Sequence, residues 1–73
     1  MIGELQKVVG ANVRRIRAER RQSQEAFGTA NGYHRTYIGR IERGDANLSL
    51  RALEELAARL AVDERELLGT EPR

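Results

Sequence analysis

The chain contains no cysteine and no tryptophan, one histidine and one proline, and only 4% of its residues are aromatic. Without cysteine it has no disulfide, no thiolate metal site and no thiol nucleophile. A single histidine with no carboxylate at ligand spacing predicts no metal site. The sequence contains no combination of a nucleophile and a general base that would indicate an enzyme. We therefore expect a protein that acts by binding, without a cofactor.

Long hydrophobic segments are also absent from the sequence. The N-terminus lacks the apolar run of a signal peptide or a membrane span, so we expect a cytoplasmic protein with no membrane partner. A length of 73 residues predicts one domain, residues 1–73, with a small core.

Charged residues make up 33% of the chain and are unevenly distributed along it. Residues 1–43 carry nine lysines and arginines against four acids, a charge of +5, whereas residues 44–73 carry four arginines against seven acids, a charge of −3. This asymmetry favours one face that binds a polyanion and another that is kept away from it. Chance scatter of charges is the alternative.

Residues 23–44 contain two short helical patterns separated by a turn. Ser23 is placed to cap the first helix, because its hydroxyl can accept an N–H of the opening turn. The pair Asn31-Gly32 suits a left-handed position that ends this helix sharply. A second helix is expected over 35–43, with Gly44 as its stop.

The second of these helices has two chemically different faces. On a helical wheel Ile38 and Ile41 share one side, and Glu42 beside them needs a partner. The opposite side carries hydrogen-bond donors and positive charge, from Thr36, Gly39, Arg40 and Arg43. Such a helix after a tight turn suits entry into the major groove of DNA. Its charge alone would equally fit a solvated surface helix in a small bundle.

This stretch resembles the helix-turn-helix of the Cro/repressor-type family, also called the xenobiotic-response-element family. The residues that match the family pattern in place are Ser23, Gln24, Glu25, Gly32, Arg35, Tyr37, Ile38, Ile41, Glu42, Arg43 and Gly44. The resemblance covers about 9–68 and implies an all-α, five-helix DNA-binding domain. A narrower similarity is to the controller proteins of restriction–modification systems, which are small dimeric regulators. It is carried by the run 34–39 and by the motifs Ile-Glu-Arg-Gly and Asn-Leu-Ser-Leu that follow it.

The resemblance implies two sets of DNA-contacting residues. N-terminal residues of a recognition helix reach base edges, and the base-reading candidates are Arg35, Thr36, Tyr37 and Arg40. Phosphate contacts are expected from Ser23, Gln24, His34, Arg43 and Asn47. The loop that follows has Asp45 where relatives often have a basic residue, which argues against a base contact from that loop.

The first helix is expected over about 2–20. Its apolar stripe is formed by Leu5, Val9, Val13 and Ile16. The resemblance pairs Arg17, on the shoulder of this stripe, with Glu42. Arg14 and Arg15 fit a solvated face, with phosphate as a possible neighbour. Gly28 replaces a helical alanine at a cost of about 1 kcal/mol, which a close approach of two helices would explain.

The C-terminal part predicts two further helices. Ser49 caps one that runs from Leu50 to about Leu60, and a capping box at 63–66 opens a short fifth. In similar proteins this part forms a two-fold dimer interface, which places a dimerisation region at about 56–68. The interface candidates are Leu60, Val62, Leu67 and Leu68. The alternative is that these residues only cover one small core.

Together these features predict a homodimeric transcriptional regulator that binds a roughly palindromic operator in double-stranded DNA and controls its own synthesis. A phage-type repressor and an antitoxin are the alternatives, and RNA polymerase or a protein toxin stay open as partners. Antitoxins usually carry a toxin-binding extension, and here only a few residues follow the last helix. RNA binding by stacking is disfavoured, because two of the three aromatic residues are expected to be packed.

Overall fold

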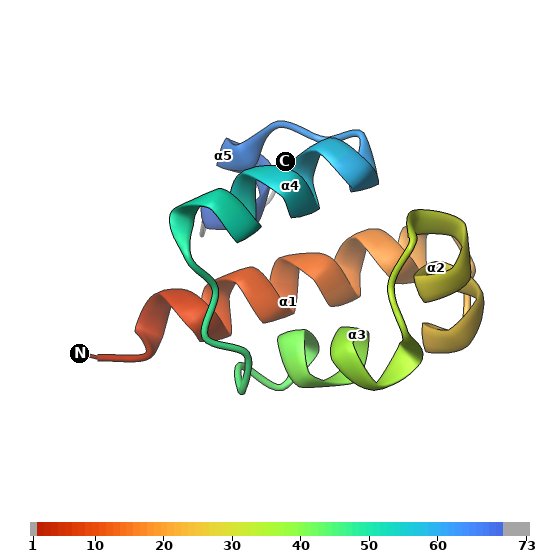
Figure 1. The fold of residues 1–73 in the computed structure, drawn as a ribbon, viewed down its shortest axis with the longest axis horizontal. Coiled ribbons are helices and arrows are strands. Elements are labelled where there is room, and N and C mark those ends of the chain that lie inside the picture. Colours follow the sequence, from red (N-terminus) through yellow and green to blue (C-terminus); the bar gives the residue numbers. More distant parts are fainter. Residues whose placement is uncertain (1, 70–73) are drawn as a thin grey trace.

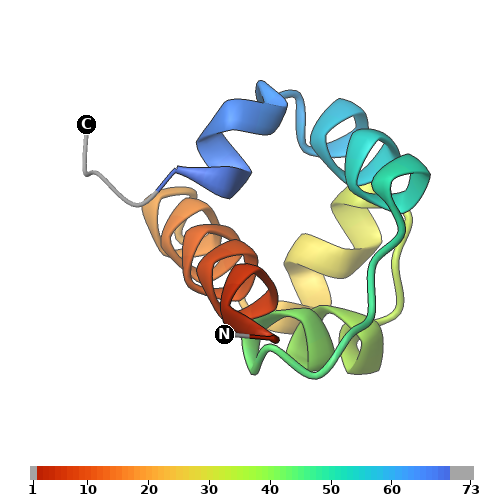
Figure 2. The same cartoon turned by 90° about the vertical axis from the view of Figure 1, so that its left-hand side faces the viewer.

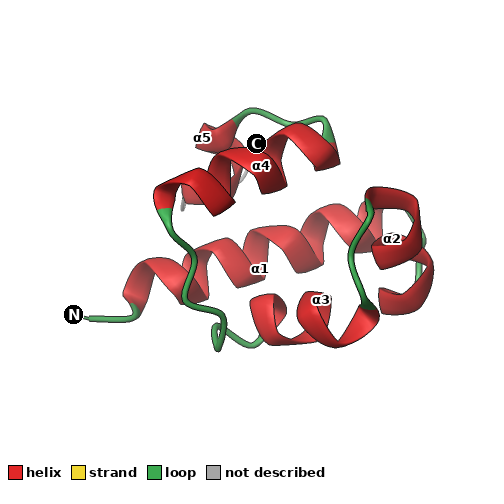
Figure 3. Ribbon diagram, in the orientation of Figure 1, coloured by secondary structure: helices red, strands yellow, loops and turns green. Residues whose placement is uncertain are grey.

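The computed structural model describes residues 2–69, which form five α-helices and no strand, as the sequence predicts (Figure 1, Figure 3). The helices are α1 (Glu4–Glu19), α2 (Gln24–Asn31), α3 (Arg35–Glu42), α4 (Leu50–Leu60) and α5 (Glu64–Leu68). None of the helices in this part of the chain is long and apolar enough to cross a membrane.

The helices surround a core to which all five contribute. In Figure 1, α1 crosses the middle of the molecule, with α3 below it and α4 above it. Figure 2, a view from the side, shows the five helices arranged as a ring. The largest fully buried side chains inside this ring are Val13, Phe27, Ile38, Ile41, Leu56, Leu60 and Leu67.

Local hydrogen bonds set most helix starts at the predicted residues. The Ser23 hydroxyl accepts from the N–H of Ala26 at 3.0 Å, and Ser49 caps α4 in the same way. Asp63 opens α5 with the predicted capping box. Gly32 ends α2 in the left-handed conformation, with φ of 84°. These positions follow the sequence because they depend on partners only two to four residues away.

Two leucines near helix starts are on the surface, and one of them, Leu5, belongs to the predicted apolar stripe. Leu5 is 63% exposed and Leu50 is 82% exposed. Leu5 lies in the first turn of α1, which extends beyond the other helices in Figure 1, and Leu50 is the first residue of α4. A periodic stripe shows which face of a helix is buried but not which end of it is covered.

Two glycines allow parts of the backbone to approach closely. A Cβ on Gly10 would lie 2.8 Å from the carbonyl oxygen of Glu42 and would collide with that of Ile41. A Cβ on Gly28 would collide with the carbonyl oxygen of Tyr33. The close approach expected at Gly28 is therefore real, but it is made by the turn before α3 rather than by α3 itself. Gly10 brings α1 against the C-terminal end of α3.

Candidate nucleic-acid interface

The outer face of α3 presents three of the four base-reading candidates to solvent. Ile38 and Ile41 on its inner face are fully buried. Arg35, Thr36 and Arg40 are exposed on the other side. Because the buried pair of isoleucines fixes the rotation of the helix about its axis, the opposite side of the helix faces solvent. Within residues 2–69, Arg35 makes one ion pair, with Glu25 at 3.9 Å, and this pair is long and exposed, so it leaves Arg35 free to turn.

Tyr37, the fourth base-reading candidate, is half-buried. Its ring centroid lies 5.5 Å from that of Tyr33, with the two planes tilted by 36°. The guanidinium of Arg59 lies over the Tyr33 ring, 5.0 Å from its centroid. Burial raises the pKa of Tyr33 and outweighs the opposing effect of Arg59. Tyr37 thus packs on the edge of the core, and only part of it is available to DNA.

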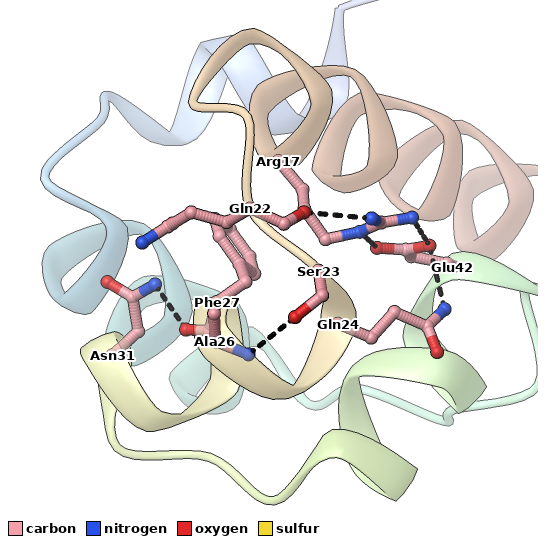
Figure 4. Close-up of polar contacts among 8 residues, drawn as sticks. All are labelled: Arg17, Gln22, Ser23, Gln24, Ala26, Phe27, Asn31 and Glu42. Atoms are coloured by element: carbon pink, nitrogen blue, oxygen red, sulfur yellow. Dashed lines mark hydrogen bonds and ion pairs between the residues drawn. The ribbon is translucent and has the colours of Figure 1, made fainter.

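A buried ion pair joins α1 to the end of α3, where the sequence placed it. The Arg17 Nε donates to Glu42 Oε2 at 2.6 Å, and its Nη2 donates to Glu42 Oε1 at 3.0 Å (Figure 4). The side chains are 19% and 5% exposed. A bidentate guanidinium–carboxylate pair is both strong and directional, so it fixes α3 against α1.

The start of α2 is attached to the same carboxylate, which sequence reasoning missed. The Gln24 Nε2 donates to Glu42 Oε1 at 3.1 Å, and Arg17 also donates to the backbone carbonyl of Gln22 at 3.0 Å (Figure 4). The position of Glu42 beside an apolar face indicated that it needs partners, but only the fold shows that Gln24 is one. This network holds both helices of the helix-turn-helix in register.

The pKa of Glu42 reflects opposing effects. Burial raises it, but the hydrogen bonds from Arg17 and Gln24 and the attraction of Arg17 and Arg14 outweigh burial, so the net pKa lies below its ordinary value. The hydrogen bond to Glu42 in turn raises the pKa of Arg17. The pair is therefore ionised at neutral pH.

Three phosphate candidates lie at helix starts. Ser23 and His34 are the N-caps of α2 and α3. Because His34 Nδ1 accepts from the N–H of Thr36 at 3.0 Å, the proton of the neutral ring is on Nε2, which can donate outward. Gln24 uses one amide N–H on Glu42 and keeps the other donor and its oxygen. Backbone N–H groups at such helix starts favour anions.

The remaining two phosphate candidates follow α3. Arg43 is the C-cap of α3, and its Nε lies 3.2 Å from Asp45 Oδ2. Both side chains are more than half exposed, and exposed pairs of this kind contribute little. Asn47 is exposed in the loop before α4. Asp45 therefore orients Arg43 without removing it from solvent.

The structure corrects the candidate dimer interface. Leu60 and Leu67 have no exposed surface, so their side chains belong to the core of one chain. Of the four candidates, Val62 is half-buried and only Leu68, 37% exposed, is on the surface. Among residues 2–69, the other exposed large apolar side chains are Ile2, Leu5 and Leu50.

Three of these exposed leucines lie together. Leu5, Leu50 and Leu68 line one shallow groove, with Leu48 and Leu53 at its base. We call Leu5, Leu50 and Leu68 the apolar patch. The sequence periodicity placed Leu5 in the apolar stripe of α1, so this patch was not visible before the fold.

Residues 2–69 contain no group of three or more His, Asp or Glu side chains arranged to hold a metal ion. The side chains on the exposed side of α3 and at its flanks are instead hydrogen-bond donors and cations. The arrangement is suited to a polyanion with readable edges, which is what duplex DNA presents.

Known proteins show the same sequence pattern and fold. A family profile described as a helix-turn-helix domain matches residues 8–68. Control protein C.BamHI of Bacillus amyloliquefaciens is 38% identical over 69 residues, which cover 93% of this chain and 85% of that protein. Both of the following structures are 35% identical to this chain. The crystal structure of the hypothetical transcription factor NHTF from Neisseria superposes with a TM-score of 0.78, covering 90% of this chain and 76% of that one.

The second structure is that of the restriction–modification controller protein C.AhdI from Aeromonas hydrophila, with a TM-score of 0.70 over 85% of this chain and 90% of that one. These matches span nearly all of the described fold and include the complete helix-turn-helix. The chain belongs to the helix-turn-helix family of DNA-binding transcriptional regulators and is similar to the controller proteins of restriction–modification systems.

Proposed function

We propose that two copies of this chain bind a roughly palindromic operator and regulate transcription from the adjacent promoter, including that of their own gene. The observation that carries this proposal is the outer face of α3, where Arg35, Thr36 and Arg40 are exposed. Phosphate candidates lie at both ends of this helix, with His34 at its start and Arg43 at its end. Phosphate contacts position a protein on DNA, whereas base contacts specify the sequence.

Arg35 is the main base-reading residue in this proposal. It opens α3, and N-terminal residues of a recognition helix reach base edges in this docking geometry. A guanidinium can donate two hydrogen bonds to O6 and N7 of guanine, and a threonine methyl can pack on the methyl of thymine. We expect one guanine contacted by Arg35 in each half-site, with Thr36 and Arg40 reading its neighbours.

The small size of the reading surface and the apolar patch both support a homodimer. One short recognition helix reads only a few base pairs, so high affinity usually needs two half-sites. Leu5, Leu50 and Leu68 offer a cluster of exposed apolar side chains of the kind that marks protein–protein interfaces. In a two-fold interface the patch of one chain would pack on the same patch of the second chain.

The similarity to controller proteins supports self-regulation. C.BamHI and C.AhdI are named as control or controller proteins. For a regulator that binds DNA as a dimer, promoter occupancy rises steeply with protein concentration, because dimerisation precedes binding. No ligand is needed for such a response.

Selection of bound sites from random duplex DNA tests the proposal. The purified chain should enrich a site with two-fold symmetry and a guanine at one position in each half. Sedimentation at the protein concentrations used should show a dimer. Enrichment of no site, or of a site without symmetry, would contradict operator binding by a homodimer.

A further inference from the structure

A second cationic surface lies on α1, outside the helix-turn-helix. Lys7, Ala11, Arg14, Arg15 and Ala18 follow one another at helical spacing on the face of α1 opposite its buried residues. With Arg43 from the end of α3, they line one shallow hollow. We call Lys7, Arg14, Arg15 and Arg43 the cationic strip. The two alanines leave open space between its long side chains.

The charges of this strip are only partly neutralised. Within residues 2–69, no hydrogen bond or ion pair is made by the side chain of Lys7 or Arg14. Arg15 pairs with Glu19 and Arg43 pairs with Asp45, each at 3.2 Å, but both pairs are exposed and can exchange for a stronger partner. The one acid that lines the hollow, Glu42, is already bound by Arg17. The strip therefore presents a net positive surface.

The strip is continuous with the proposed DNA interface. Arg43 belongs both to the strip and to the phosphate candidates that follow α3. Glu42 lines the hollow and accepts a hydrogen bond from Gln24, another phosphate candidate. A duplex seated on α3 would thus bring its sugar–phosphate backbone to the edge of the strip.

We propose that the cationic strip binds phosphates of the duplex that flanks the half-site, outside the major groove that α3 enters. This inference rests on the proposed function. Lys7 and Arg14 are seven residues apart, about 10 Å along α1, while phosphates of one strand follow each other about every 3.4 Å along the duplex axis. The strip is long enough to reach more than one phosphate, and its contacts carry no sequence information.

An acidic protein segment is the competing occupant, and the composition of the strip disfavours it. Stable protein interfaces are anchored by buried aromatic, apolar or arginine side chains in packed pockets. Here the apolar lining consists of Ala11 and Ala18, and the hollow is shallow. Backbone phosphates need only charge and donors, which this surface supplies.

The test measures the salt dependence of operator binding for Arg14→Ala and for the double variant Lys7→Met, Arg14→Ala. Lys7→Met keeps the alkyl chain that packs near Gly44. The matched control is Arg51→Ala, an exposed arginine on α4, on the other side of α1 from α3 (Figure 1). Thermal unfolding and sedimentation of each variant check that fold and assembly are unchanged.

On a long operator duplex, the slope of log affinity against log salt should become shallower by about 0.9 for Arg14→Ala and about 1.8 for the double variant, because one released counterion accompanies each phosphate contact. Base preference should be unchanged, and Arg51→Ala should match the wild type. On a duplex trimmed to the two half-sites, wild type and double variant should have the same slope.

A wild-type slope in both variants on the long duplex would overturn the proposal, and so would a difference that persists undiminished on the trimmed duplex. Failure of the proposed function looks different. In that case the wild type itself would bind the selected operator no better than random DNA, and both proposals would fall together.

Discussion

The helix-turn-helix and the apolar patch are two surfaces built on one core, and they differ in what fixes them. Around α3 the exposed side chains are polar, and Arg17, Gln24 and Glu42 lock the two helices to α1 through hydrogen bonds (Figure 4). At the patch the exposed side chains are leucines at the ends of helices. The first surface is organised before any ligand arrives, whereas the second leaves apolar area uncovered.

In the proposed function, the two surfaces of this 73-residue chain have different tasks. A surface that reads bases must hold its hydrogen-bond donors at defined positions. A buried ion pair can serve this purpose, even where two apolar side chains in its place would be equally stable. A surface that associates with a second copy gains most from apolar area removed from water. A substitution that breaks one surface should therefore leave the other intact.

The largest effect is expected at the ion pair. Glu42→Ala leaves Arg17 partly buried without its partner and should lower the free energy of unfolding by roughly 3–5 kcal/mol, as for other buried pairs broken on one side. Urea denaturation measures this loss. The matched control is Glu19→Ala, which removes the exposed pair with Arg15 and should change stability by less than about 1 kcal/mol. Equal losses in the two variants would show that burial of the pair contributes nothing.

The same carboxylate should make stability sensitive to acid. Its pKa in the folded state lies below the ordinary value of 4.5, so the folded state favours the ionised form. The contribution of Glu42 is therefore complete above about pH 4.5 and is lost as the pH falls through the lowered folded-state pKa. Urea midpoints measured between pH 7 and pH 3 should fall less steeply for Glu42→Gln than for the wild type. An identical acid dependence in both proteins would contradict this assignment.

Assembly should depend on the patch and not on the network. Leu50→Glu places a charge in the centre of the proposed two-fold contact and should weaken dimerisation at least about a hundredfold, since each copy loses apolar burial. Sedimentation measures this change. The fold should survive, because Leu50 is 82% exposed. Leu60→Glu would be uninformative, since it should unfold the core. A Leu50→Glu variant that still dimerises like the wild type would move the interface elsewhere.

The sequence predicts what depends on near neighbours in the chain. The caps at Ser23 and Asp63 and the left-handed end at Gly32 require only residues of the same turn. The pair of Arg17 and Glu42 was also predictable, because the helical wheel left a carboxylate beside an apolar face and the family resemblance supplied its partner.

Which apolar residues are buried depends on how the helices dock. The periodicity of the sequence carries no information about docking. Leu60 and Leu67 are apolar residues at helical spacing like Leu5 and Leu50, yet the first two are buried and the last two are exposed. Gly10 could have been noticed, since it lies beside Arg17 on the wheel of α1, at the edge of the apolar stripe. Its role appears only when the backbone of α3 is seen against it.

Base reading by Arg35 in α3 can be separated from phosphate binding by comparing affinities on different DNA sequences. Affinities of the wild type and Arg35→Ala are compared on the selected operator, on operators with each base pair changed in turn, and on random DNA, at one salt concentration. Arg35→Ala should lose about 1–3 kcal/mol on the operator and relax the preference at one base pair in each half-site, with a smaller loss on random DNA. A loss by the same factor on operator and random DNA would show that Arg35 contacts only phosphate, and would contradict the account.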